Sequence, residues 1–133
     1  MARSIAQNYR KAQVSTAGPG QRVVLMYEGL VKELKKGKIN LVKAQKEISA
    51  MEAAHNALSL ASQIILELRL ALDMDKGGEI AENLRDLYDF WTIQISNSNT
   101  QKDAKLLSPV ISMAEELRDT WKEASSKARQ IGA

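Results

Sequence analysis

Apolar residues recur along the first half of the chain at alternating intervals of four and three. The row consists of Val23, Tyr27, Leu30, Leu34, Gly37, Leu41, Ala44 and Ile48. This heptad spacing is typical of a long helix that packs against others at a shallow angle. We therefore predict a helix over about residues 19–47, with Gly18 as N-cap and Pro19 in the first turn. Gly37 lies on the row, where a small residue lets another helix approach closely, so we place it inside the helix despite a cost of about 1 kcal/mol.

A second apolar row predicts a helix over about residues 50–74. Its members are Met51, Ala54, Leu58, Ala61, Ile65, Leu68 and Leu72, and it is widened by Ala57, Leu60, Ile64, Leu66 and Leu70. Ser49 and Glu52 have the spacing of a capping box, so we expect the Ser49 hydroxyl to cap this helix. Because most of its circumference is apolar, the helix is either the most buried one or one wall of a docking groove.

Two more rows predict a third helix over about 79–97 and a fourth over about 103–128. The third row holds Ile80, Leu84, Leu87, Trp91 and Ile95, and the fourth holds Leu107, Val110, Ala114, Leu117, Trp121, Ala124 and Ala128. Gly77 and Gly78 are expected to end the second helix, and the polar residues 96–101 to form a connector. For the fourth helix we favour Asp103 as N-cap over Ser108, with a bend near Pro109.

Four helices joined by short connectors predict an all-α, antiparallel up-down four-helix bundle. We assign residues 18–133 to this single domain, and residues 1–17 to a short mobile N-terminal arm with one short helix near residues 5–11. A chain of 133 residues is long enough to bury a core as one domain.

Composition narrows the setting of the protein. The chain has no cysteine, which excludes a disulfide framework, and shows neither a secretory signal nor an apolar run long enough for membrane insertion. We therefore expect a cytoplasmic protein. Its net charge of +3 comes from 19 basic and 16 acidic residues. Six lysines between Lys32 and Lys46 form either a solvated helix face or a surface that attracts phosphates, but no docking motif for nucleic acid accompanies them.

The single histidine, His55, is the main candidate for chemistry. It follows Glu52 at the i, i+3 spacing of half a di-iron site, but the chain has no second histidine to complete such a site. The alternative hypothesis is that the four-helix bundle is a phosphotransfer module that uses His55. We find no nucleophile motif or phosphate-binding loop, so we predict no catalytic, cofactor-binding or metal-binding residues and no enzyme activity.

The surplus of apolar residues says more about function than His55 does. Tyr88, Phe90 and Trp91 in the third helix cannot all face one core. Excess apolar surface on a small protein marks either a partner-binding site or a surface that the N-terminal arm covers.

Three blocks of sequence resemble the flagellin-specific export chaperones of bacterial flagella. The first block is Tyr9, Gln13-Val14, Thr16-Ala17, Pro19 and residues 25–29; the second is Leu72-Asp73, residues 77–81, Asn83-Leu84 and Leu87-Tyr88; the third is residues 116–124. Residues 36–54 match the family only in length and character. Two further positions, Gly20 and Pro109, depart from its pattern.

The resemblance implies a helical bundle without catalytic activity, whose N-terminal segment can occlude an apolar surface. It implies a cytoplasmic chaperone that binds the disordered C-terminal region of flagellin, prevents premature polymerisation and keeps flagellin competent for type III export. Further partners would be the export gate or a co-chaperone, and the free protein would be a monomer or weak homodimer. A generic helical adaptor is the blander alternative.

We therefore expect client contacts on the second and third helices, and a switching segment in the arm. The candidate client contacts are Leu60, Ile64, Leu84, Leu87 and Tyr88, and the candidate arm residues are Tyr9, Gln13 and Val14. For each of these residues, ordinary core packing is the competing interpretation.

Overall fold

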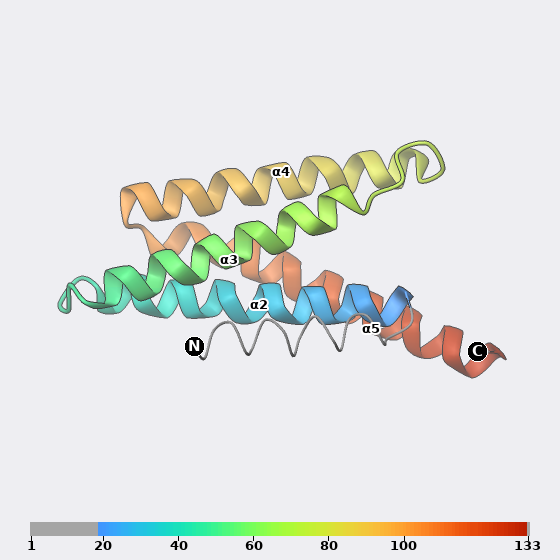
Figure 1. Ribbon diagram of the computed structural model, residues 1–133, viewed down its shortest axis with the longest axis horizontal. Coiled ribbons are helices and arrows are strands. Elements are labelled where there is room, and N and C mark those ends of the chain that lie inside the picture. Colours follow the sequence, from blue (N-terminus) through green and yellow to red (C-terminus); the bar gives the residue numbers. More distant parts are fainter. Residues whose placement is uncertain (1–18, 133) are drawn as a thin grey trace.

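The protein folds as an antiparallel bundle of long helices, as predicted. The computed structural model describes residues 19–132, and side chains from 20 to 127. Its elements within that range are α2 (Pro19–Lys43), α3 (Ala50–Leu70), α4 (Gly78–Gln101), the short 3-10 helix η1 (Ala104–Leu107) and α5 (Ser108–Gly132), with no strand among them. In Figure 1, α3 lies between α2 and α4, while α5 crosses behind α2. The expected arm, including the helix near residues 5–11, lies outside the described residues.

The core follows the apolar rows read from the sequence. The largest side chains that are almost fully buried are Trp91, Tyr27, Leu30, Leu34, Leu41, Leu58, Ile65, Leu107 and Val110. They come from α2, α3, α4, η1 and α5, so every described element contributes to one core. The heptad rows predicted these faces because the same residue spacing repeats on each packed helix.

Gly37 lies inside α2, as expected, and packs directly against Leu58 of α3. A Cβ atom added at Gly37 would lie 2.5 Å from Cδ2 and 2.9 Å from Cγ of Leu58, which is itself buried. Only glycine therefore fits this contact without displacing the leucine. The C-terminal end of α2 was misplaced, since the helix ends at Lys43 and residues 44–46 form turns.

The predicted capping box at the start of α3 is wrong. Ser49 has helical φ and ψ angles of −59° and −25°, and its side chain makes no capping hydrogen bond. An N-cap hydroxyl reaches the helix amides from an extended backbone, which Ser49 does not adopt. Instead, the amides of Ala50 and Met51 donate to the carbonyls of Glu47 and Ile48, at 3.0 and 2.9 Å. A preceding turn thus satisfies the first amides of α3.

The second helix also ends earlier than predicted, at Leu70 rather than near residue 74. The following turn is held by Asp73, whose carboxylate accepts hydrogen bonds from the amides of Asp75 and Lys76. This local alternative competes with helix continuation. The paired glycines shape the next helix start instead: Gly78 has a φ of +56°, and a Cβ at Gly77 would lie 2.6 Å from the Asp73 carbonyl oxygen.

Residues 96–101, which we predicted to form a connector, are the last turns of α4. Ser98 is fully buried, and its hydroxyl donates to the carbonyl of Ile95 at 2.8 Å. Packing of Ile95 and Ser98 in the core therefore keeps a polar segment helical. The helix ends at Gln101, and Lys102, with a left-handed backbone (φ 57°), forms its C-cap.

The last helix starts in two steps. Asp103 caps the 3-10 helix η1, with its carboxylate accepting from the amide of Lys105 at 3.0 Å. The α-helix then begins at Ser108 and places Pro109 in its first turn, where no amide hydrogen is needed. We expected one α-helix to run from Asp103 with a bend near Pro109. Asp103 is a cap as expected, but it caps a 3-10 helix, and the α-helix starts only at Ser108.

Three aromatic side chains join α2 and α4 in the middle of the core. The hydroxyls of Tyr27 and Tyr88 are 2.6 Å apart, so one donates a hydrogen bond to the other. Trp91 lies edge-on to Tyr27 with ring centroids 6.4 Å apart, and its centroid is 5.5 Å from that of Tyr88. Burial raises the pKa of both phenols above their usual range near 10.

Alkaline titration should reveal this pair. We expect two of the three tyrosines to remain protonated in the folded protein well above pH 10 and to ionise only on unfolding. Since the unfolded state then releases protons first, stability should be full below pH 10 and fall as the pH rises above it. Phenolate absorbance followed against circular dichroism measures this directly. Ionisation of all three tyrosines near pH 10 with the helices intact would contradict the buried pair.

Candidate functional site

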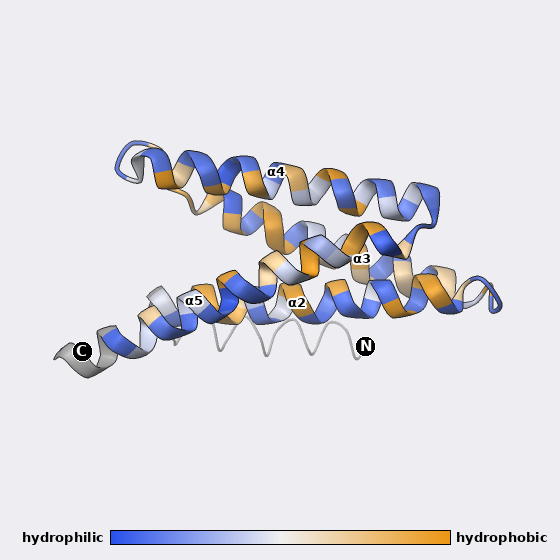
Figure 2. Ribbon diagram, turned by 180° about the vertical axis from the view of Figure 1, so that it is seen from behind, coloured by the Kyte–Doolittle hydropathy of each residue, from blue (hydrophilic) through white to orange (hydrophobic). Residues whose placement is uncertain are grey.

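Several large apolar side chains on α3 and α4 face solvent. The exposed ones are Leu66 (53%), Leu70 (73%), Ile80 (73%), Phe90 (42%) and Ile93 (57%). Figure 2 shows hydrophobic residues recurring along both helices. Scattered exposed apolar residues are normal, but five on two adjacent helices make a candidate binding surface.

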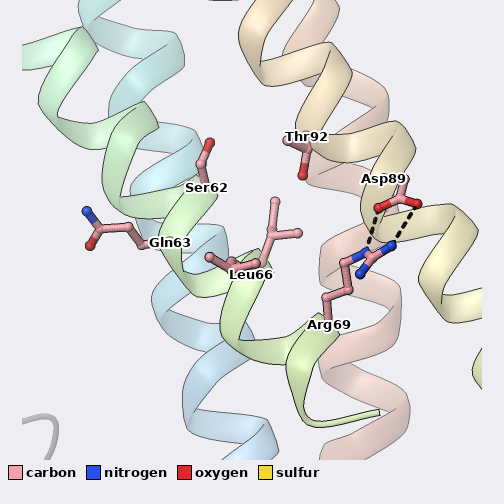
Figure 3. A pocket seen from close by; sticks show the side chains of 7 residues that line it. Ser62, Gln63, Leu66, Arg69, Asp89 and Thr92 are labelled. Carbon is pink, nitrogen blue, oxygen red and sulfur yellow. Dashed lines mark hydrogen bonds and ion pairs between the residues drawn. The ribbon is translucent and has the colours of Figure 1, made fainter. Parts of the chain in front are cut away.

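A groove of about 450 Å³ runs between α3 and α4. It is lined by Ser62, Gln63, Ile65, Leu66, Arg69, Asp89 and Thr92. Figure 3 shows Leu66 between the two helices and Arg69 reaching across to Asp89 on α4. The groove thus combines an apolar floor with polar groups at its edges, which suits a peptide with both kinds of side chain.

An ion pair links the two sides of the groove. Arg69 Nε lies 2.7 Å from Asp89 Oδ1, and Arg69 Nη2 lies 3.4 Å from Asp89 Oδ2. The hydrogen bond from Arg69 lowers the pKa of Asp89, and the charge of Arg85 adds to this effect, while the same bond raises the pKa of Arg69. The pair is therefore formed at neutral pH and is lost as the pH falls through the lowered pKa of Asp89. Both side chains are about half exposed, so solvent weakens the pair.

A second polar link joins α3 to α4 beside His55. The side-chain amide Nδ2 of Asn99 lies 3.1 Å from Nδ1 of His55. In the described part of the chain no three acidic, histidine or cysteine residues are grouped as a metal site would require. His55 is thus placed as a link between helices.

The residues predicted as client contacts lie further inward than expected. Ile64 and Tyr88 are buried in the core, and Leu60, Leu84 and Leu87 are partly buried against it. All five are on α3 and α4, but none lines the groove. Their packing in this state favours a structural role, while their contact with a client stays a prediction. The arm residues Tyr9, Gln13 and Val14 lie outside the described residues.

Sequence reasoning missed most of the groove residues. Leu66 was visible as a member of the widened second row, and its position off the main seam was the one available signal. Arg69, Asp89 and Thr92 carried no such signal because a groove between two helices depends on their relative register. That register is set by core packing rather than by either sequence segment alone.

The sequence matches the profile of the protein family described as "Flagellar protein FliS" over residues 1–128. The chain belongs to the FliS family. The resemblance seen in the three sequence blocks is thereby confirmed over nearly the whole chain.

Related chains agree with this assignment. A flagellar secretion chaperone FliS of Vibrio cholerae is 32% identical, with 98% of this chain and 96% of the relative covered. One of Salmonella typhimurium is 32% identical over 95% and 90%, and one of Bacillus subtilis is 28% identical over 92% and 86%. A solved crystal structure of a bacterial flagellar chaperone has a TM-score of 0.72 at 21% identity, covering 96% of this chain and 99% of the other, and supports the fold.

Membership in FliS decides between the functional alternatives. The relatives are chaperones rather than enzymes, and nothing in the family match supports a phosphotransfer role for His55. Within residues 19–132 no helix has the length and apolar character needed to cross a membrane.

Proposed function

We propose that this flagellar secretion chaperone binds the disordered C-terminal region of flagellin in the cytoplasm, prevents its premature polymerisation and keeps it competent for export. It would act by binding alone, without catalysis. The carrying observation is the full-length relation to flagellar secretion chaperones. The exposed apolar side chains of α3 and α4 would be a surface for such a client.

The energetics of this task favour a long interface. Ordering a disordered segment costs about 1–2 kcal/mol per residue in backbone entropy. Each fully buried apolar side chain returns about 1.5–3 kcal/mol. A client must therefore bury many apolar residues along an extended surface, and it gains little from a single pocket.

We propose that the client lies along α3 and α4. Leu66 in the groove and Ile93 on α4 would be its outer contacts, and both are more than half exposed. The inward residues Leu60, Ile64, Leu84, Leu87 and Tyr88 would contribute where the client reaches the margin of the core. Tyr9, Gln13 and Val14 would belong to an arm that occludes the surface until the client displaces it.

Calorimetric titration with the C-terminal segment of the same organism's flagellin tests the proposal. We expect saturable one-to-one binding with a large negative heat-capacity change, because apolar surface is buried. The peptide should gain helicity, and affinity should change little between low and high salt. A folded protein that gives a flat titration would contradict flagellin binding. We also expect contacts with the export gate or a co-chaperone. The free protein is expected to be a monomer or a weak homodimer.

A further inference from the structure

A row of lysines runs along the face of α2 that points away from the core. Lys32, Lys36, Ile39, Lys43 and Lys46 follow one another at intervals of four, three, four and three. Within α2, which ends at Lys43, this interval pattern places Lys32, Lys36, Ile39 and Lys43 on one face, and Lys46 lies in the turn that follows. All five are exposed in the structure. We call this row, with the adjacent Val42 and Ile48, the basic ridge.

Lysines outnumber carboxylates along the basic ridge. Between residues 32 and 48 there are six lysines and two acidic residues: Glu33, whose side chain is buried (5% exposed), and Glu47, which is exposed. Lys35, beside the ridge, is paired with Glu115 of α5 at 3.1 Å. Two more exposed lysines, Lys102 and Lys105, precede or lie in η1, which packs against α2.

Apolar side chains stand among these charges. Ile39, Val42 and Ile48 are 55%, 52% and 86% exposed. Ile48 lies in the connection between α2 and α3, which is the loop at the left of Figure 1. A surface that presents lysines around exposed aliphatic residues can satisfy both only against a partner that is anionic outside and apolar just beneath.

Two features of the basic ridge indicate the class of partner: its cationic residues are lysines, and it contains no aromatic residue. Protein interfaces are enriched in arginine and aromatic residues and depleted in lysine. The cationic residues of the basic ridge are all lysines. The arginines with described side chains lie elsewhere: Arg22, Arg69, Arg85 and Arg118. Single-stranded nucleic acids stack on aromatic residues, and none occurs between residues 32 and 48. Clustered lysines beside aliphatic residues are the pattern that binds acidic phospholipids.

We propose that the basic ridge docks the protein peripherally on membranes that contain anionic phospholipids. The lysines contact the headgroups, and Ile39, Val42 and Ile48 enter the interface between headgroups and acyl chains. The ridge lies on α2 and the connection that follows it, whereas the groove lies between α3 and α4, so docking does not require a bound client. This places a secretion chaperone at a membrane surface without insertion of a helix across it.

Co-sedimentation of the full-length protein with vesicles tests the proposal. We expect binding to vesicles of phosphatidylcholine with phosphatidylglycerol, weakening as salt rises, and little binding to phosphatidylcholine alone. Each lysine removed near an anionic surface lowers partition about fivefold, so the triple variant Lys32→Gln, Lys36→Gln, Lys43→Gln should bind on the order of 100-fold more weakly. Ile48→Ser should weaken binding severalfold at every salt concentration.

The matched control removes three exposed lysines elsewhere, with Lys76→Gln, Lys122→Gln and Lys127→Gln. It has the same net charge as the ridge variant and should lose less than about fivefold. Equal losses in the two triple variants would overturn the ridge as the docking site. Absence of binding to anionic vesicles, or equal binding to phosphatidylcholine alone, would overturn membrane docking and leave an acidic protein as the partner of this face.

Discussion

We expect replacement of Trp91 by alanine to lower the free energy of unfolding by about 3–5 kcal/mol. Trp91 is fully buried and packs against both tyrosines that join α2 to α4. The deletion removes a large apolar side chain and leaves a cavity in the core between the two tyrosines. Urea denaturation followed by circular dichroism measures the loss, since replacing Trp91 itself changes the tryptophan fluorescence.

The neighbouring residue provides the control. Phe90 is 42% exposed, so Phe90→Ala should cost about 1 kcal/mol or less. Trp91→Phe should cost less than Trp91→Ala, because it retains much of the volume and removes an indole Nε1 that has no hydrogen-bond partner among the described residues. Equal losses for Trp91→Ala and Phe90→Ala would refute this description of the core.

The second large effect is expected at Gly37. Gly37→Val should lower the free energy of unfolding by about 2–3 kcal/mol, because its side chain enters space that Leu58 already fills. The gain in helix propensity, about 1 kcal/mol at most, does not offset this overlap. Thermal or urea unfolding of the variant gives the value.

Two comparisons separate overpacking from a general effect of changing a glycine. Gly20→Ala, in the same helix, meets only Ser125 at ordinary contact distance, 3.4 Å, and should be neutral or slightly stabilising. Leu58→Ala combined with Gly37→Val should cost less than the sum of the single changes, since the two side chains compete for one space. Strict additivity would argue against close approach of α2 and α3 at this point.

The sequence predicted the core better than the helix ends. The apolar rows, including Gly37 on the first of them, follow a period that each packed helix imposes, so residues such as Tyr27, Leu58 and Trp91 were assigned to core-facing rows. Helix ends depend on competition among a few local hydrogen bonds. At Ser49 the backbone angles excluded the expected cap, and at residue 71 the Asp73 turn displaced the helix.

Residues 96–101 show the opposite failure. Their polar composition predicted a connector, yet α4 continues through them to Gln101. The buried Ser98 and the contact of Asn99 with His55 anchor this segment from other elements. Composition carries no information about such contacts, so tertiary structure overrode the local signal.

The candidate site was also predicted only in part. The two helices that form it were predicted, because their surplus apolar residues are visible in the sequence. The particular side chains were not: Tyr88 and Ile64 lie in the core, while Leu66, Arg69 and Asp89 line the groove. Hydrophobicity alone selects the most buried residues, whereas a binding surface consists of the moderately apolar residues that packing leaves exposed.

The most direct test of the account is the affinity for the flagellin C-terminal segment of two variant pairs with matched exposure. Leu66→Glu with Ile93→Glu changes residues that are 53% and 57% exposed on α3 and α4, and Ile39→Glu with Val42→Glu changes residues that are 55% and 52% exposed on α2. We predict that the first pair lowers affinity at least about 30-fold, since each apolar contact contributes more than 1 kcal/mol, while the second stays within about twofold. Equal affinities for the two folded variants would contradict client binding along α3 and α4.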